Sequence, residues 1–267
     1  MSRPRRLTLE SLENRTVPAT ALTDAIVPEN NNTAADTQQT AATSTNTDVE
    51  LQYVQRIYAD LLGRNIDAGA HAYVDALHTG AMNRHDVAES VLHSDEYGSR
   101  QINGMFQTFL GRAADDAALN GYLDELHHGA TIQAIGVDIL SSGEYQAKHA
   151  GGDAFLTSVY HDLLGRDLDA TATASYGTRY TSDPTQAHAI VDEIMNSTEM
   201  RQRTGEAIIS LMLDSAPIPG IPNKYVTESI NGTPMDSIIS EIAATASYSD
   251  IGRSASTFLP GQPNVSY

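Results

Sequence analysis

The stretch Leu61-Leu62-Gly63-Arg64-Asn65-Ile66-Asp67 decides the fold, because the chain contains its pattern three times. The pattern returns as Phe109-Leu110-Gly111-Arg112-Ala113-Ala114-Asp115 and as Leu163-Leu164-Gly165-Arg166-Asp167-Leu168-Asp169. Each copy has two apolar residues, then Gly-Arg, then an Asp three residues after the Arg. The copies lie 48 and 54 residues apart (111 − 63 and 165 − 111), so the chain is built from repeats. These residues are called the signature glycines, arginines and aspartates below.

An amphipathic helix is predicted before each signature. Apolar residues recur there at three- and four-residue steps, which places them on one helix face: Val54, Ile57, Tyr58, Leu61 and Leu62 in the first copy. The equivalent positions are apolar in the other two copies. The signature glycine tolerates left-handed backbone and should end this helix. The signature aspartate should accept the free N–H groups at the start of a second helix.

The rest of each repeat predicts two more helices. Second helices are expected over about 68–78, 116–127 and 170–180, with a ring at Tyr122 and Tyr176 but Val74 at that step in the first copy. After a turn, a third helix leads to a closing Ser-x-Glu motif, whose serine should cap a fourth helix. The closing residues are Ser94 and Glu96, Ser142 and Glu144, and Ser197 and Glu199.

These patterns predict an all-α protein of helical repeats, packed as a bundle or short solenoid, with a disordered N-terminal segment. A degenerate fourth repeat has Leu213-Asp214 in place of Gly-Arg, and we expect it to cap the stack. The predicted organisation is a leader-like segment (1–20), a disordered linker (21–48), repeats over 49–98, 99–150 and 151–203, the degenerate repeat (204–250) and a flexible tail (251–267).

The composition limits the classes of partner. Asp and Glu number 34 against 16 Lys and Arg, which gives a net charge of -18. Such a charge repels nucleic acid and anionic membrane surfaces, so we expect neither as a partner. The absence of cysteine excludes disulfides, thiol catalysis and cysteine-ligated zinc. No run of about 18 apolar residues exists, so we expect no transmembrane segment.

The N-terminus carries a leader-like pattern, R-L-x-L-E-x-L-E-x-R-x-x-P-A, from Arg6 to Ala19. It resembles a leader at the start of many exported planctomycete proteins, and this resemblance implies an extracellular or cell-envelope location. A standard signal peptide would show about 7–15 apolar residues, which Glu10 and Glu13 interrupt here. The alternative is a cytoplasmic protein whose N-terminus forms a short amphipathic helix.

The order Y-x-x-L-L-G-R-x-x-D, L-x-x-G, S-x-E-Y resembles the bacterial domain of unknown function 4214, over Leu51–Met200 and weakly to Tyr248. The L-G-R-x-x-D element is also similar to the linker domain of phycobilisomes. The resemblance implies an all-helical module of exported, multi-domain surface proteins, with no assigned reaction. The chain departs from the family three and seven residues after the aspartate. Gly and Trp are usual there, but this chain has Ala70, Ala118 and Ala172, then Val74, Tyr122 and Tyr176.

The signature arginines Arg64, Arg112 and Arg166 are the sharpest polar feature. One hypothesis makes them three anion- or partner-binding sites. The other makes each a brace that binds its own signature aspartate, or the closing glutamate, and fixes helix ends. Arg offers five donors in a rigid fork suited to such bracing, so we favour the brace.

No cofactor, metal ion or catalytic residue is predicted. Asp167, Asp169 and Thr171 start like a calcium loop, but Gly is missing at the sixth position and Thr178 stands at the twelfth in place of Glu. The adjacent His127 and His128 would point about 100° apart on a helix and would not converge on one ion. No G-x-S-x-G, P-loop or G-x-G-x-x-G pattern occurs.

The sequence therefore favours a non-catalytic, exported interaction or scaffold module of the cell envelope, with a protein or cell-surface component as partner. The alternatives are an enzyme-associated module, or a carbohydrate- or small-ligand-binding module, with an unrecognised site. A deep cleft lined by non-repeated polar residues would favour an enzyme. Exposed aromatic residues on one face would favour a carbohydrate binder.

Overall fold

A computed structural model describes residues 47–151, 153–213, 223–245 and 247–248. The expectations for the leader, for most of the linker and for the tail lie outside these residues. The described residues form helices and turns and contain no strand, which confirms the all-α prediction. None of the helices in the described part is both long and apolar enough to span a membrane.

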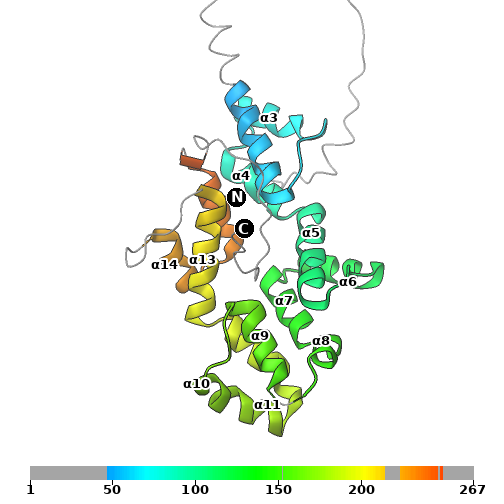
Figure 1. Cartoon of the computed structure of the whole chain (residues 1–267). Coiled ribbons are helices and arrows are strands. Elements are labelled where there is room, and N and C mark those ends of the chain that lie inside the picture. Colours follow the sequence, from blue (N-terminus) through cyan, green and yellow to red (C-terminus); the bar gives the residue numbers. More distant parts are fainter. Residues whose placement is uncertain (1–46, 152, 214–222, 246, 249–267) are drawn as a thin grey trace, which may run out of the picture.

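The elements follow the predicted repeat order (Figure 1). In chain order they are a helix over 47–57, η1 (Tyr58–Leu62), α3 (His71–His78), α4 (Arg84–Leu92), α5 (Asp95–Met105), η2 (Phe106–Leu110), α6 (Asp116–His127), α7 (Ile132–Ser141), α8 (Gly143–Lys148), α9 (Ala154–Leu164), α10 (Ala170–Ala172), η3 (Thr173–Gly177), α11 (Thr178–Ser182), η4 (Pro184–Gln186), α12 (Ala187–Met195), α13 (Thr198–Leu213), α14 (Lys224–Ile230) and α15 (Met235–Ala243). The second helix of the third repeat, expected as one piece, is divided into α10, η3 and α11.

The repeats pack in two pairs, and each pair has its own core. The first core joins the first repeat to the fourth, with Ile238 and Ile242 of α15 among its residues. The second core joins the second repeat to the third. In both pairs the third helices of the two repeats make the contact: α4 packs on α15, and α7 packs on α12.

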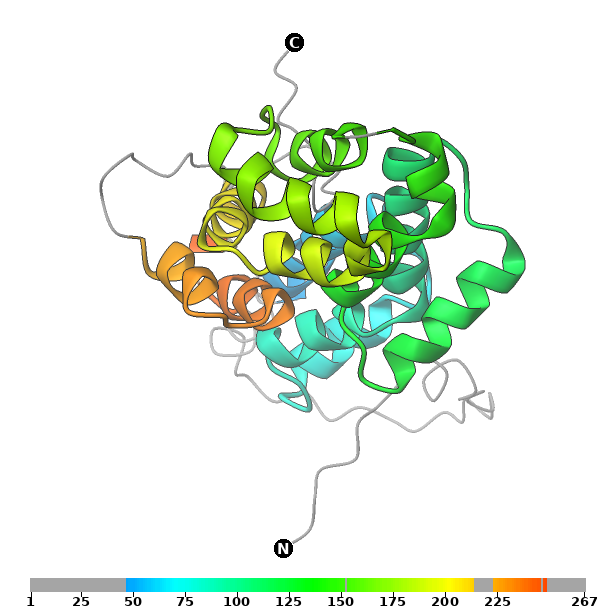
Figure 2. The same cartoon turned by 90° about the horizontal axis from the view of Figure 1, so that it is seen from below.

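This pairing differs from a linear stack. The degenerate repeat does not extend the third repeat outward but returns to the first one. Long α13 explains the return, because it starts at the third closing motif and runs up to the first core, where Leu211 and Met212 are buried (Figure 1). The described helices form an elongated bundle of two repeat pairs (Figure 1), whose helices overlap when the molecule is viewed from below (Figure 2).

One tyrosine–aspartate contact is repeated in the two pairs. The hydroxyl of Tyr145 donates to Asp162 at 2.8 Å, and the hydroxyl of Tyr248 donates to Asp60 at 2.9 Å. Each aspartate stands three residues before a signature glycine, and each tyrosine holds a closing position of the paired repeat. A second ring meets each tyrosine edge-on at 78°, with Phe155 at 6.1 Å from Tyr145 and Tyr53 at 6.0 Å from Tyr248.

The pair formed by repeats 1 and 4 is the more deeply buried. The Asp60 side chain is 2% exposed, whereas that of Asp162 is 21% exposed. Arg56 also lies over the Tyr248 ring at 3.9 Å and donates to the Met212 carbonyl at 2.7 Å. Arg56 therefore joins the first helix of the fold to both ends of the fourth repeat.

Replacing Tyr248 by Phe should lower the free energy of unfolding by about 1–3 kcal/mol, because it removes a donor from a buried carboxylate. Tyr145→Phe should cost less, about 0.5–1.5 kcal/mol, because water reaches Asp162 and can replace the lost donor. Urea unfolding followed by circular dichroism gives both values. Equal losses in the two variants would contradict the difference in burial.

Candidate functional site

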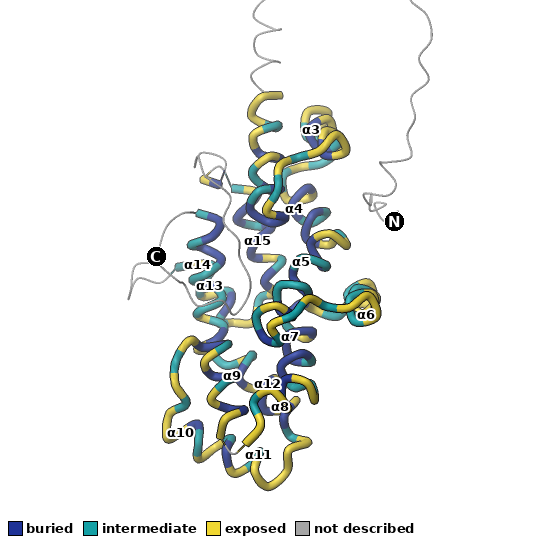
Figure 3. Tube along the Cα trace, turned by 45° about the vertical axis from the view of Figure 1, so that its right-hand side comes forward, coloured by how far each residue is buried: buried dark blue, intermediate teal, exposed yellow. Residues whose placement is uncertain are grey.

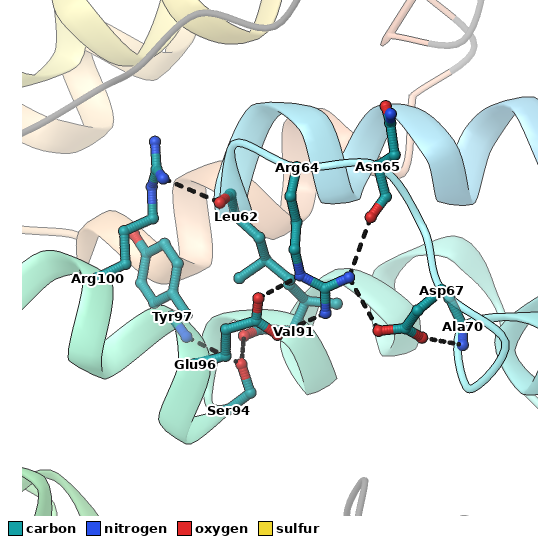
Figure 4. Close-up of polar contacts among 10 residues, drawn as sticks. All are labelled: Leu62, Arg64, Asn65, Asp67, Ala70, Val91, Ser94, Glu96, Tyr97 and Arg100. Carbon is teal, nitrogen blue, oxygen red and sulfur yellow. Dashed lines mark hydrogen bonds and ion pairs between the residues drawn. The ribbon is translucent and has the colours of Figure 1, made fainter.

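The signature of the first repeat closes into a brace between two helix ends (Figure 4). Arg64 binds both carboxylate oxygens of Glu96, through Nε and through Nη2 at 2.7 Å. Its Nη1 donates to the carbonyl of Asn65 at 3.0 Å and lies 2.9 Å from the Asp67 carboxylate. One guanidinium thus connects the end of the first helix to the starts of the second and the fourth.

The other two repeats form the same brace. Arg112 binds Glu144 at 2.6 Å through both Nε and Nη2, and Arg166 binds Glu199 at 2.7 and 2.8 Å. Such paired, parallel hydrogen bonds are the strong form of an Arg–carboxylate contact. Only the aspartate arm differs, because Arg112 Nη1 lies 3.8 Å from Asp115 where the other two repeats have 2.9 Å.

The capping residues of the signature lie where helix ends need them. The signature glycines have φ of 64°, 72° and 59°, which is left-handed backbone that favours glycine. The signature aspartates accept from the N–H of Ala70, Ala118 and Ala172 at 2.8–3.1 Å. The closing serines accept from the N–H of Tyr97, Tyr145 and Met200 at 3.2 Å. The motif is a helix stop, a brace and a helix start.

An aromatic ring lies beneath each signature arginine. The guanidinium carbons of Arg64, Arg112 and Arg166 stand 4.9–5.0 Å from the ring centres of Tyr58, Phe106 and Tyr160. This cation–π contact uses only the ring face, which explains why Phe106 can replace tyrosine in the second copy.

A second repeated cation was missed by the sequence analysis. Arg100 donates to the Leu62 carbonyl at 2.9 Å, and Lys148 donates to the Phe109 carbonyl at 3.1 Å. In the third repeat, Arg203 lies against Gly165. Positive charge at a helix C-terminus stabilises its free carbonyl groups. Spacing could have identified these cations, because each follows the closing glutamate by four residues. A side chain at Gly63 would collide with the Arg100 guanidinium, so close approach also favours glycine there.

The brace shifts the ionisation of its members. Hydrogen bonds from Arg112 and Arg166 lower the pKa of Glu144 and Glu199 below the usual glutamate value, although burial opposes this. The hydrogen bond from the Ala172 N–H, with Arg166, lowers the pKa of Asp169. These carboxylates stay ionised near neutral pH and bound to the chain's own donors, so the geometry favours the brace over an anion site.

The other candidate residues do not converge. Among the described residues, no three or more His, Asp or Glu side chains gather as metal ligands would. Asp169 is used by Arg166 and by its helix cap. His127 binds Asp95 at 2.6 Å, while His128 lies 3.5 Å from Asp124.

The second repeat contains an open cleft of about 310 Å³ beside its brace. Phe106, Leu110 and Ile139 form apolar walls, and Arg112, Ser142 and Glu144 belong to the signature and closing motifs. The α6 side of the cleft carries Ala118, Gly121, Tyr122 and Glu125. Among the described residues of α6 none is buried, and the helix stands out at the side of the bundle (Figure 3).

The position of the aromatic ring on the second helix differs between the first and second repeats, and this difference explains part of the cleft. Tyr122 meets Phe106 at 6.1 Å and 64°, and in the first repeat Tyr73 meets Tyr58 at 6.4 Å and 62°. The first repeat therefore has its ring one residue before Val74, on a helix that is buried at both positions. In the second repeat the residue equivalent to Tyr73 is Gly121, and a Cβ atom at this position would have open space around it.

A comparison with protein families finds one match in this chain. The family described as Domain of unknown function (DUF4214) matches residues 34–101. This confirms the predicted resemblance for the first repeat. The DUF4214 match ends just after the first closing motif, and the second and third repeats share its brace geometry. Neither a curated protein nor a solved structure matches the chain.

Replacing Arg112 by Ala should lower the melting temperature by a few degrees, because two helix ends lose a shared partner. Arg112→Lys should recover only part of the loss, since an ammonium group cannot form the paired contact with Glu144. Thermal unfolding followed by circular dichroism measures both variants. An alanine variant as stable as the wild type would contradict the brace.

Acid should weaken the braces. A group whose pKa is lowered in the folded state contributes stability above its unfolded pKa and loses it as the pH falls. The melting temperature should therefore fall between about pH 5 and pH 3. A Glu144→Gln/Glu199→Gln variant should start lower at neutral pH and show a smaller fall. Parallel curves for variant and wild type would contradict a role for these two carboxylates.

Proposed function

We propose that this chain is a non-catalytic interaction or scaffold module of the cell envelope, exported and bound to a protein or cell-surface component. The observation that carries this proposal is the state of α6. Every other described helix of eight residues or more buries side chains in one of the two cores, whereas no residue of α6 is buried. α6 packs on the second core only through half-buried side chains such as Leu119, Leu123 and Leu126. Its outer face, beside an open cleft, is therefore available to a partner.

The use of the repeated polar residues supports the same function. The signature arginines and closing glutamates bind one another, so the most regular polar groups serve the fold. What differs between repeats is the surface, and the second repeat has an open cleft beside its brace. Fixed braces with a variable surface suit a scaffold whose binding face can change while the fold is kept.

A carbohydrate-binding function has less support. Such a site needs exposed aromatic residues on one face, and within the described residues Val49 is the only exposed large hydrophobic side chain. In the cleft, Arg112 lies over Phe106, and Tyr122 contacts the same ring edge-on. The Phe106 ring is thus already in contact with two of the chain's own side chains.

A pull-down with the full chain as bait tests the proposed function. Envelope fractions of a planctomycete should yield a specific component that the bait retains above background at about 0.3 M salt, where exposed charge attraction is screened. An unrelated protein of similar negative charge serves as control bait, because an acidic surface collects basic proteins. Recovery of the same components with both baits, or of none, would count against an interaction module.

A further inference from the structure

The aromatic rings of this chain recur beside a cation and a carboxylate. In the three braces, an arginine lies between a ring and a glutamate. Lys224 likewise stands 5.4 Å from the Tyr225 ring centre and pairs with Glu241. The arrangement is favourable because the ring face and the carboxylate both attract positive charge.

The ring of the second repeat's cleft departs from this arrangement. Burial raises the pKa of the Tyr122 hydroxyl, and the carboxylates of Asp138 and Glu125 raise it further. Glu125 lines the cleft together with Tyr122, whereas Asp138 is paired with His188 at 3.1 Å. In the third repeat the equivalent ring, Tyr176, has both Glu193 and Arg179 near it. Arg179 occupies the position of Glu125 (165 + 14 against 111 + 14), and it binds Glu193 at 2.8 and 2.9 Å. The second repeat thus has a carboxylate where the third has its cation.

The cleft can receive a cation from outside. Its lining has one arginine and two glutamates, and Arg112 is neutralised by its paired contact with Glu144. Glu125 forms no ion pair among the described residues, so one negative charge faces the opening. Asp116 and Asp124 add exposed negative charge on the same helix. Phe106, Leu110 and Ile139 supply an apolar wall for the aliphatic part of a long side chain.

Building on the interaction function proposed above, we propose that this cleft binds a lysine or arginine side chain on an exposed segment of a partner protein. The aliphatic stem lies along the apolar wall, and the cationic head lies between Tyr122 and Glu125, as each signature arginine lies over a ring and binds a glutamate. The volume, about 310 Å³, is at the small end of the usual range of ligand pockets, about 300–1,000 Å³. It suits one side chain presented by a larger molecule.

The test uses the full chain and a capped peptide, acetyl-Gly-Ser-Arg-Ser-Gly-amide. Its control is the same peptide with citrulline, which has nearly the shape of arginine but no charge. Amide NMR shifts should change at Gly121, Tyr122 and Glu125 with the arginine peptide and saturate on titration. The citrulline peptide should bind about tenfold more weakly or worse. Equal binding of the two peptides, or shifts centred elsewhere, would overturn the proposal, as would stronger shifts at these residues with a neutral pyranose.

Two variants test the site itself. Glu125→Arg reproduces the third repeat and should lose at least about tenfold in affinity for the arginine peptide. Gly121→Phe places a ring in the cleft, where a Cβ at this position has open space around it, and should also abolish binding. Asp75→Arg makes the same charge change at an exposed position of α3 and should bind like the wild type. Circular dichroism and melting curves check that each variant is folded. An equal loss of peptide affinity in Asp75→Arg would show that the net charge of the chain, not the cleft, determines binding, and would overturn the proposal.

The envelope pull-down, repeated with Glu125→Arg, separates the two proposals. A component recovered by the wild type and lost with this variant supports both. A component recovered equally by both leaves the interaction function in place and overturns the cleft as its site. Peptide binding without any envelope component supports the cleft and counts against the envelope function.

Discussion

The paired contact between a signature arginine and its closing glutamate is the constraint on which each repeat depends. It joins residues 32 or 33 positions apart and fixes the end of one helix against the start of another. At 34–40% exposure of the arginine side chain, the ion pair alone would contribute little. The stabilisation comes from several contacts of one group, because the same guanidinium also lies over a ring and donates to the loop carbonyl. Glycine, serine and aspartate then satisfy the backbone groups that the helix ends leave free.

The two repeat pairs show how similar helical repeats can pack into a bundle in which the last repeat contacts the first. A repeat presents its third helix to another repeat, so α4 with α15 and α7 with α12 make the same contact. Between the halves, Met105, Met195, Met200 and Met235 line a small cavity next to Phe109 and Gly136. Methionine is flexible and fills irregular gaps, which suits a junction between two cores that do not share the repeat's regular packing.

The sequence predicts the elements of this fold better than their partners. Gly63, Arg64 and Asp67 are local signals, and their geometry follows from spacing and hydrogen-bonding capacity. The return of the fourth repeat to the first depends on Asp60 and Tyr248, which are 188 residues apart. Their repeat positions are the same as those of Asp162 and Tyr145, but the positions alone do not say which two repeats pair. The cleft was not predictable for another reason. Its lining comes from η2, α6, α7 and the second closing motif, and no local pattern states how these elements lie against one another.

The pairing of the first repeat with the fourth has a consequence for the order of folding. The second and third repeats are consecutive, so their core can form from one continuous piece of chain. The first repeat cannot complete its core until the fourth is present, and Arg56 meets Met212 only across 156 residues. Closing the longer loop costs more chain entropy, so the inner pair should assemble before the outer pair and serve as its template. During synthesis, the N-terminal repeat is made first, but its core is completed last.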